Sequence, residues 1–209
     1  MEKAEHQHYR QHHEVKIGRL EALVDAVFAF AMTLLVLNLV VPRALSAADF
    51  DATLLGLTQD ILIYFLSFVI LGSIWMIINW QATHIERSDT IHLWVGIFLL
   101  MFVALAPFAT YILTEYIGTT AADIFFAADV MMIGLFLFAN WFYATENHRL
   151  VSSSLDRKTI SRGRFRSLII IGVGALVMAV SVFLPGWSAF IYLFIPVLSM
   201  FFLVDRGGN

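Results

Sequence analysis

The stretch Arg19–Pro42 has the sequence RLEALVDAVFAFAMTLLVLNLVVP. It holds about twenty consecutive apolar or small residues, which is long enough for one helix to cross a bilayer. Three polar side chains interrupt it: Asp25 near its start, Thr33 in its middle and Asn38 near its end. Polar and ionisable groups are costly in hydrocarbon and normally face protein or water. The stretch is therefore typical of a membrane helix that packs inside an assembly.

The rest of the chain repeats this apolar pattern. Of its 209 residues 60% are hydrophobic and only 14% are charged, whereas soluble domains have about 45–50% apolar and about 25% charged residues. A soluble protein of this size cannot bury so many apolar helices in one core. We predict an all-α, polytopic membrane protein with six transmembrane helices. They are expected at about 22–41, 61–80, 91–113, 121–143, 166–184 and 187–204.

The distribution of Lys and Arg predicts the orientation of these helices. Twelve of the thirteen basic residues lie on one side of the expected membrane, and only Arg43 lies on the other. By the positive-inside rule both termini are cytoplasmic and the protein lies in the cell membrane. The domains are then a polar cytoplasmic arm at 1–18, a six-span domain at 19–204 and a cytoplasmic tail at 205–209. The arm contains closely spaced histidines that could bind a metal ion. Because the arm is expected to be exposed and flexible, we favour a disordered tail over a metal site.

Several kinds of chemistry have no residues to support them. The chain has no cysteine, which excludes disulfides, thiolate metal sites and a cysteine nucleophile. No nucleophile-elbow or metalloprotease pattern occurs, so no catalytic residue, metal site or cofactor is predicted. The expected partners are the lipid bilayer, monovalent cations and copies of the chain itself, and no nucleic acid.

Helical geometry separates the polar residues of the first span. At about 100° per residue, Phe30, Thr33 and Leu37 fall on one stripe, with Leu34 on it and Ala26 beside it. Thr33 either bonds to the carbonyl one turn earlier, which is common in membrane helices, or lines a narrow pore.

Asp25 lies about 140° around the helix from Phe30 and faces other neighbours. It is either an anchor that ties the first span to the next two, or a residue that binds a cation or proton in a pathway. We favour the anchor. The candidate donors to its carboxylate are Trp75, Asn79, His84 and His92.

In the first span Arg19 is followed by three further residues and then by Leu23-Val24-Asp25, and Thr33 stands eight residues after the aspartate. The spacing of Arg19, Asp25 and Thr33 resembles the first-helix signature of the transmembrane protein 175 family. Ser67-Phe68-x-x-Leu71-Gly72-x-x-Trp75 is similar to the second span of the family, and Leu105-Ala106-Pro107-Phe108 to the third. The order and spacing of these matches over nearly all six spans carry the resemblance.

The resemblance implies a potassium-selective or potassium-preferring cation channel that conducts passively. Bacterial members are homotetramers in which the first helix of each subunit lines the pore, and no TVGYG filter is present. The constriction then falls on Phe30, the hydroxyl layer on Thr33 and a further apolar ring on Leu37. Ala26 and Leu34 lie beside this pore. Four residues form the structural polar network: Arg19, Asp25, Trp75 and Asn79.

The chain departs from the family pattern at the network and at the constriction. Leu23-Val24 replaces Phe-Ser, and Ile78 and Asn79 replace two histidines. Phe30 stands where Ile or Leu is usual, so we expect a bulkier ring. An alternative function is a small proton- or cation-coupled secondary transporter that uses Asp25 and Asp129. No repeated halves or discontinuous helices support it.

Overall fold

The computed structural model describes residues 2–40 and 54–197, and within these ranges the chain is helical with one isolated β-bridge, between Ile85 and Val151. The main helices are α1 (Glu2–Leu34), α3 (Thr58–Ala82), α4 (Thr90–Glu115), α5 (Thr120–Thr145) and α6 (Arg157–Ser181). Three short 3-10 helices follow some of them: η1 (Leu35–Asn38), η2 (Glu146–His148) and η3 (Ser188–Leu193). Five helices in the described ranges are long and apolar enough to cross a membrane.

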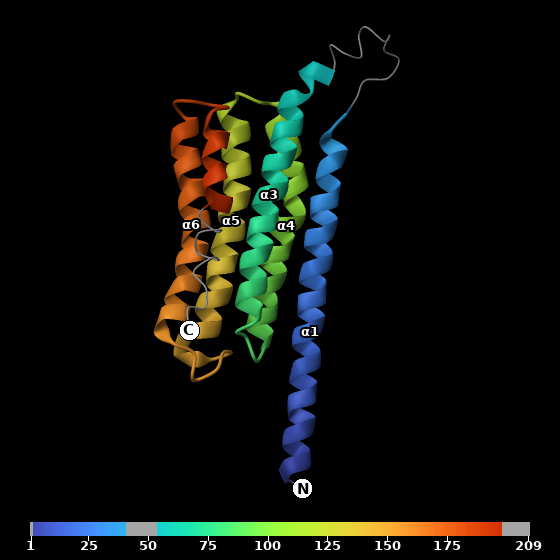
Figure 1. The fold of residues 1–209 in the computed structure, drawn as a ribbon, viewed down its shortest axis with the longest axis vertical. Coiled ribbons are helices and arrows are strands. Elements are labelled where there is room, and N and C mark those ends of the chain that lie inside the picture. Colours follow the sequence, from blue (N-terminus) through green and yellow to red (C-terminus); the bar gives the residue numbers. More distant parts are fainter. Residues whose placement is uncertain (1, 41–53, 198–209) are drawn as a thin grey trace.

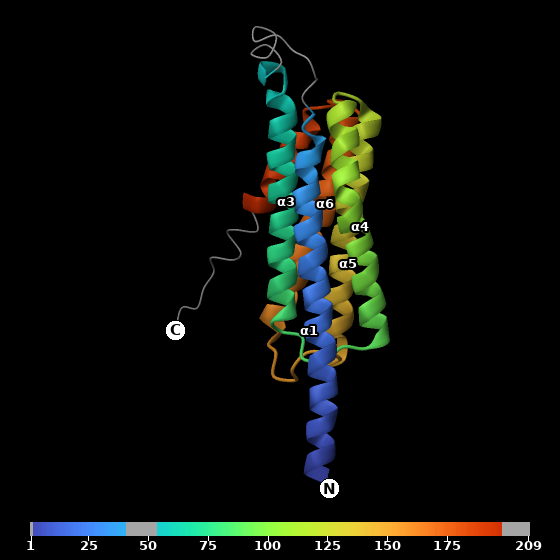
Figure 2. The ribbon, with the colours of Figure 1, turned by 90° about the vertical axis from the view of Figure 1, so that its right-hand side faces the viewer.

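Helices α3 to α6 run alternately up and down, because short connections join neighbours in antiparallel order. Helices α3 to α6 form a bundle, and α1 stands at its edge and extends beyond its lower end (Figure 1). In the view turned by 90°, α1 lies in front of the bundle, flanked by α3 and α4 (Figure 2). The first helix is therefore the most peripheral of the five.

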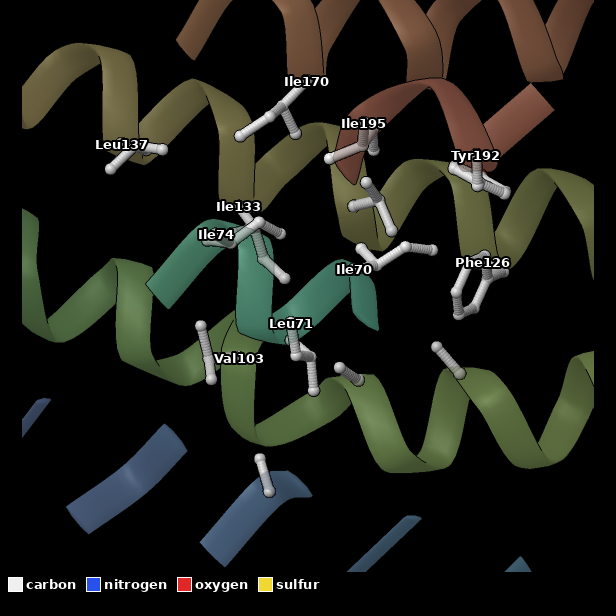
Figure 3. Packing of buried hydrophobic residues seen from close by; sticks show 14 of the residues in the cluster. Ile70, Leu71, Ile74, Val103, Phe126, Ile133, Leu137, Ile170, Tyr192 and Ile195 are labelled. Carbon is white, nitrogen blue, oxygen red and sulfur yellow. The ribbon is translucent and has the colours of Figure 1, made fainter. Parts of the chain in front are cut away.

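The core lies between the four bundle helices and η3. Figure 3 shows Ile74 of α3, Val103 of α4, Ile133 of α5 and Ile170 of α6 in this cluster, all fully buried or nearly so. Tyr192 of η3 packs edge-on against Phe126 at 5.2 Å between ring centroids. In lipid, side-chain packing of this kind and hydrogen bonds hold helices together, since the hydrophobic effect gives little preference for helix over lipid.

Close contact between α5 and α6 depends on glycine. A Cβ atom at Gly134 would lie 2.9 Å from Ile170, and one at Gly163 would collide with the indole of Trp141. That indole Nε1 donates a hydrogen bond to the carbonyl oxygen of Ile160 at 2.9 Å. Small residues at these points let the two backbones approach.

Helix boundaries agree with the predicted spans in the middle of the chain and differ at two places. The prediction of a flexible arm before residue 19 was wrong in its conformation, because α1 begins at Glu2. The fifth span was predicted to start at 166, but α6 begins at Arg157, where Asp156 caps it by accepting a bond from the Thr159 N–H at 3.3 Å. Lys and Arg are good helix formers, and their long side chains can extend from the first turns of α6 to the membrane–water interface.

Pro107 lies inside α4, and the helix continues past it to Glu115. The predicted span 187–204 begins in η3, and its residues 198–204 lie outside the described residues, so this span stays a prediction. The turn before it has Gly186 at φ 82°, and its N–H donates to the Asp123 carboxylate at 2.8 Å.

Candidate functional site on the first helix

One face of α1 packs on the bundle. Val24, Phe28, Ala31 and Leu35 are buried, at spacings of four, three and four residues. This is the repeat of a single helical stripe. Even so, only 17% of the apolar 18-residue window within Gly18–Asn38 is buried, against 39–50% for the corresponding windows of the other four spans. The single chain thus leaves most of its first span uncovered.

The opposite face of α1 carries the predicted pore stripe. Phe30 is 66% and Leu37 is 68% exposed, and Ala26 and Thr33 are exposed as well. Each lies two positions after a residue of the buried stripe, which is about 200° around the helix. Leu34, also predicted near the pore, is partly buried. The stripe therefore faces away from the bundle, while the opposite face of α1 is packed against it.

The hydroxyl of Thr33 is turned toward its own backbone. Its Oγ1 donates a hydrogen bond to the carbonyl oxygen of Phe30 at 2.8 Å. A hydroxyl has one proton and two lone pairs. Because the proton is engaged with the backbone, the lone pairs are the part of this group that remains for a neighbour on the exposed side.

The carboxylate of Asp25 is tied to the second span. Trp75 Nε1 donates to Asp25 Oδ1 at 2.9 Å, within the usual length of a hydrogen bond to a charged acceptor. Both residues are exposed on the single chain. Arg19 is exposed and makes no ion pair within the described ranges. Of the four candidate donors, only Trp75 is bonded to Asp25.

A cavity of about 60 Å³ lies behind this part of α1. Asp25 and Glu21 line it from α1, Asn79 from α3, His92 from α4 and Asn140 from α5. The cavity is large enough for a few water molecules. Asn79 is thus beside Asp25 without a hydrogen bond between them in the structure.

His92, which lines this cavity, lies in the first turn of α4, next to the capping residue Asp89. His92 is 4% exposed, and its Nδ1 lies 3.0 Å from the Ser88 Oγ, while its Nε2 has no hydrogen-bond partner in the described part of the chain. Asp89 caps α4 by accepting from the His92 N–H at 2.9 Å and also accepts from the Tyr143 hydroxyl at 2.7 Å. Burial opposes ionisation of Asp89, but these two hydrogen bonds outweigh it and lower its pKa. The cap therefore also joins α4 to α5.

The upper end of the first span is held by Asn38, for which no role was predicted. Asn38 Nδ2 donates to the carbonyl oxygen of Pro107 at 3.1 Å. The available signal was an amide near the end of an apolar span, but its partner lies 69 residues away. Asn38 thus holds η1 against α4.

Asp129, the second carboxylate of the transporter alternative, lies apart from Asp25. It is 2% exposed on α5, and neither carboxylate oxygen has a hydrogen-bond partner within the described ranges. It does not line the cavity that contains Asp25. The structure does not bring the two aspartates into one site.

Comparison with known proteins gives relatives of a single kind. A protein of Streptomyces collinus described as a potassium channel is 29% identical over 153 residues, which cover 71% of this chain and 74% of that protein. A potassium channel of Chamaesiphon minutus is 31% identical over 150 residues, 68% of this chain and 73% of the relative. A potassium channel of a Chryseobacterium species is 31% identical over 173 residues, which cover 80% of this chain and 84% of the relative.

A solved structure and a family model agree with these relatives. The crystal structure of a lysosomal potassium-selective channel TMEM175 homolog from Chamaesiphon minutus matches with a TM-score of 0.72 and 25% identity, over 91% of this chain and 97% of that one. The model of the family described as endosomal/lysosomal potassium channel TMEM175 matches residues 19–107. Such relatives are channels and not enzymes, and with five candidate spans in the described part of the chain the protein is a multi-pass protein of the cell membrane. The chain belongs to the TMEM175 family.

Proposed function

We propose that this protein is the subunit of a potassium-preferring cation channel, in which four copies place α1 around a central, passive pore. The observation that carries the proposal is the stripe of Phe30, Thr33 and Leu37, left open on a helix whose opposite face is packed. The relatives described as potassium channels support the same function. The bilayer and permeating potassium ions are the remaining partners, and no cofactor is required.

Phe30 forms the constriction of the proposed pore, and Leu37 forms a second apolar ring. Apolar rings gate by dewetting and raise the barrier most for ions that hold their water tightly. Potassium sheds water more readily than sodium, so such a ring favours potassium without direct ligands. The faces of four phenyl rings also attract a passing cation.

Thr33 supplies oxygen ligands just above this constriction. Thr33 is three positions after Phe30 in the helix, a rise of about 4.5 Å. Its proton is bonded to the Phe30 carbonyl, so each subunit offers lone pairs of the hydroxyl oxygen to the axis. A ring of four such oxygens replaces part of the water that an ion loses in the constriction.

The polar network is proposed to hold the stripe in register. Asp25 accepts from Trp75 on the face away from the stripe, and Asn79 lines the same cavity as Asp25. Arg19 lies on α1 six residues before Asp25. Twelve basic residues at this end of the expected spans indicate that it faces the cytoplasm, with both termini.

Ion flux from purified protein in liposomes tests the proposal. With opposing potassium and sodium gradients, the parent should conduct potassium in preference to sodium. Phe30→Ala should raise total flux and lower the preference, because it widens the constriction. Phe65→Ala, which truncates a 58% exposed phenylalanine on α3, is the matched control and should change neither. A Phe30→Ala channel with the flux and preference of the parent would contradict the assignment of the stripe.

Thr33→Val provides a second test. Valine has nearly the shape of threonine but no oxygen, so potassium flux should fall while assembly is retained, as size-exclusion chromatography would report. Unchanged flux would show that the hydroxyl only bonds to its own helix.

A secondary transporter remains the second candidate because Asp129 is a buried carboxylate without a partner in the described residues. Such a protein would show uptake that saturates with substrate, is driven by a pH gradient and is lost in Asp129→Asn. A channel would show unsaturated, electrodiffusive flux that persists in this variant.

A further inference from the structure

A second and larger cavity lies at the lower end of the bundle, away from α1. It has a volume of about 490 Å³ and lies between the end of α5, η2 and the first turns of α6. Its lining includes Asn147 and His148 of η2 and Arg157, Ser161 and Arg164 of α6. Of these groups, Arg164 contacts Thr145 and Glu146, and the His148 Nε2 lies 3.3 Å from the carbonyl oxygen of Leu155.

The three residues of α6 share one face of the helix. They follow one another at spacings of four and three residues, so their side chains lie within about 60° of one another around the axis. Two guanidinium groups and a hydroxyl are thereby directed along the same wall. Every one of these groups donates hydrogen bonds.

Arg164 is held in a fixed position at this wall. One of its terminal nitrogens donates to the Thr145 Oγ1 and to the Glu146 Oε2, both at 3.4 Å. Its guanidinium carbon lies 4.7 Å from the centre of the Phe142 ring. Its Nε is buried and has no hydrogen-bond partner in the described part of the chain. The buried Nε is out of reach of a ligand, but a cation positioned in this way can offer its remaining terminal N–H groups to an additional anionic acceptor.

Arg157 adds a charge that the protein does not neutralise. It is exposed and makes no ion pair within residues 18–40 and 54–197. Glu146 is the single acidic residue of the lining, and Arg164 already binds it. The cavity therefore carries an excess of positive charge.

The backbone of η2 is strained where it borders the cavity. Asn147 and His148 have φ values of 51° and 52°, in the left-handed region that residues other than glycine rarely adopt. Two such residues in succession cost free energy and are found at ligand-binding turns more often than elsewhere. Both residues line the cavity and bring an amide and an imidazole to it.

We propose that this cavity binds a phosphate group, with Arg157 and Arg164 as its principal contacts and His148, Asn147 and Ser161 as neutral or weakly basic donors. Arginine pairs with phosphate through two parallel hydrogen bonds, and basic pockets between membrane helices take the headgroups of anionic lipids. The same chemistry would serve a soluble phosphate ester. In the proposed orientation the cavity opens at the cytoplasmic surface, where both sources are present.

Binding measurements on the detergent-solubilised protein test this proposal without any measurement of ion flux. Phosphatidylglycerol is the lipid probe, phosphatidylcholine its uncharged comparison, and glycerophosphate the soluble probe. The dissociation constant of each is measured at about 0.15 M salt for the parent, Arg157→Gln and Lys158→Gln. Both variants lose one positive charge from the same helical turn, but Lys158 does not line the cavity. Diffuse electrostatic attraction is weakened equally in the two variants. The difference between their dissociation constants therefore reports the contribution of the cavity.

We expect Arg157→Gln to weaken binding about tenfold, as the loss of a charged hydrogen bond does, and Lys158→Gln to weaken it no more than about twofold. Tight binding of phosphatidylglycerol alone identifies the lipid headgroup as the ligand, and binding of glycerophosphate with the same variant pattern identifies a soluble ester. Equal weakening in both variants would show diffuse attraction only and would overturn the proposal. The proposal would also be overturned if phosphatidylglycerol and phosphatidylcholine bound with the same dissociation constant and glycerophosphate did not bind.

Discussion

The hydrogen bond from Trp75 to Asp25 should contribute measurably to the position of α1. Its length of 2.9 Å is that of a bond to a charged acceptor, and such bonds contribute about 1.5–3 kcal/mol. Trp75 is 38% exposed on the single chain, so solvent competes and the lower end of this range applies, about 1.5 kcal/mol. This corresponds to roughly a tenfold change in the unfolding equilibrium.

A double-mutant cycle isolates this bond from the packing of the indole ring. The parent, Trp75→Phe, Asp25→Ala and the double variant are unfolded by titration with sodium dodecyl sulfate in mixed micelles, with circular dichroism as the readout. The two single substitutions together should destabilise more than the double variant does, by about 1.5 kcal/mol. Asp25→Asn should lose less than Asp25→Ala, since an amide oxygen still accepts the bond. A coupling energy below about 0.5 kcal/mol would refute the anchor.

Two further predictions concern other contacts of the bundle. Gly163→Ala should destabilise the protein by about 1–3 kcal/mol in the same titration, because the new Cβ collides with Trp141. Gly172→Ala, whose Cβ has nothing within 4 Å, should not destabilise it. Equal effects of the two substitutions would show that the tight contact is unimportant. Asp89 has a lowered pKa in the folded protein, so its contribution is present above its unfolded pKa of about 3.9 and is lost as pH falls through the lower folded value. Asp89→Asn should flatten this acid-side fall in stability, and an unchanged pH profile would contradict the role of the cap.

The two faces of α1 could be predicted because they depend only on helical periodicity. Phe30, Thr33 and Leu37 fall on one stripe by their spacing alone, and the structure leaves that stripe open. The same geometry placed Asp25 on another face, toward a short list of donors. Which donor bonds to it depends on how α3 packs against α1, and the sequence did not decide between Trp75 and the other three.

Contacts between distant parts of the chain were beyond the sequence. The bond from Asn38 to the carbonyl of Pro107 depends on the axial alignment of α1 and α4, which no local pattern encodes. The close approach of Gly163 to Trp141 likewise appears only when α5 and α6 are packed.

Helix ends were predicted least well where charge and hydropathy disagree. The first turns of α6 are basic, so a hydropathy pattern placed the start of the span at 166. The helix in fact begins at Arg157, because Asp156 caps it and its arginines extend to the interface. Hydropathy locates the part of a helix that lies in hydrocarbon, and capping residues locate the helix itself.

The central claim, that the open stripe of α1 lines the ion pathway, is tested most directly by cysteine accessibility. The chain has no cysteine, so single cysteines can be introduced without background reaction. Channels carrying Thr33→Cys or Leu37→Cys should lose potassium flux when a water-soluble, cationic thiol reagent is added. Channels with Ala31→Cys, on the buried face, should be unaffected. Flux that survives complete labelling at both stripe positions would contradict the claim.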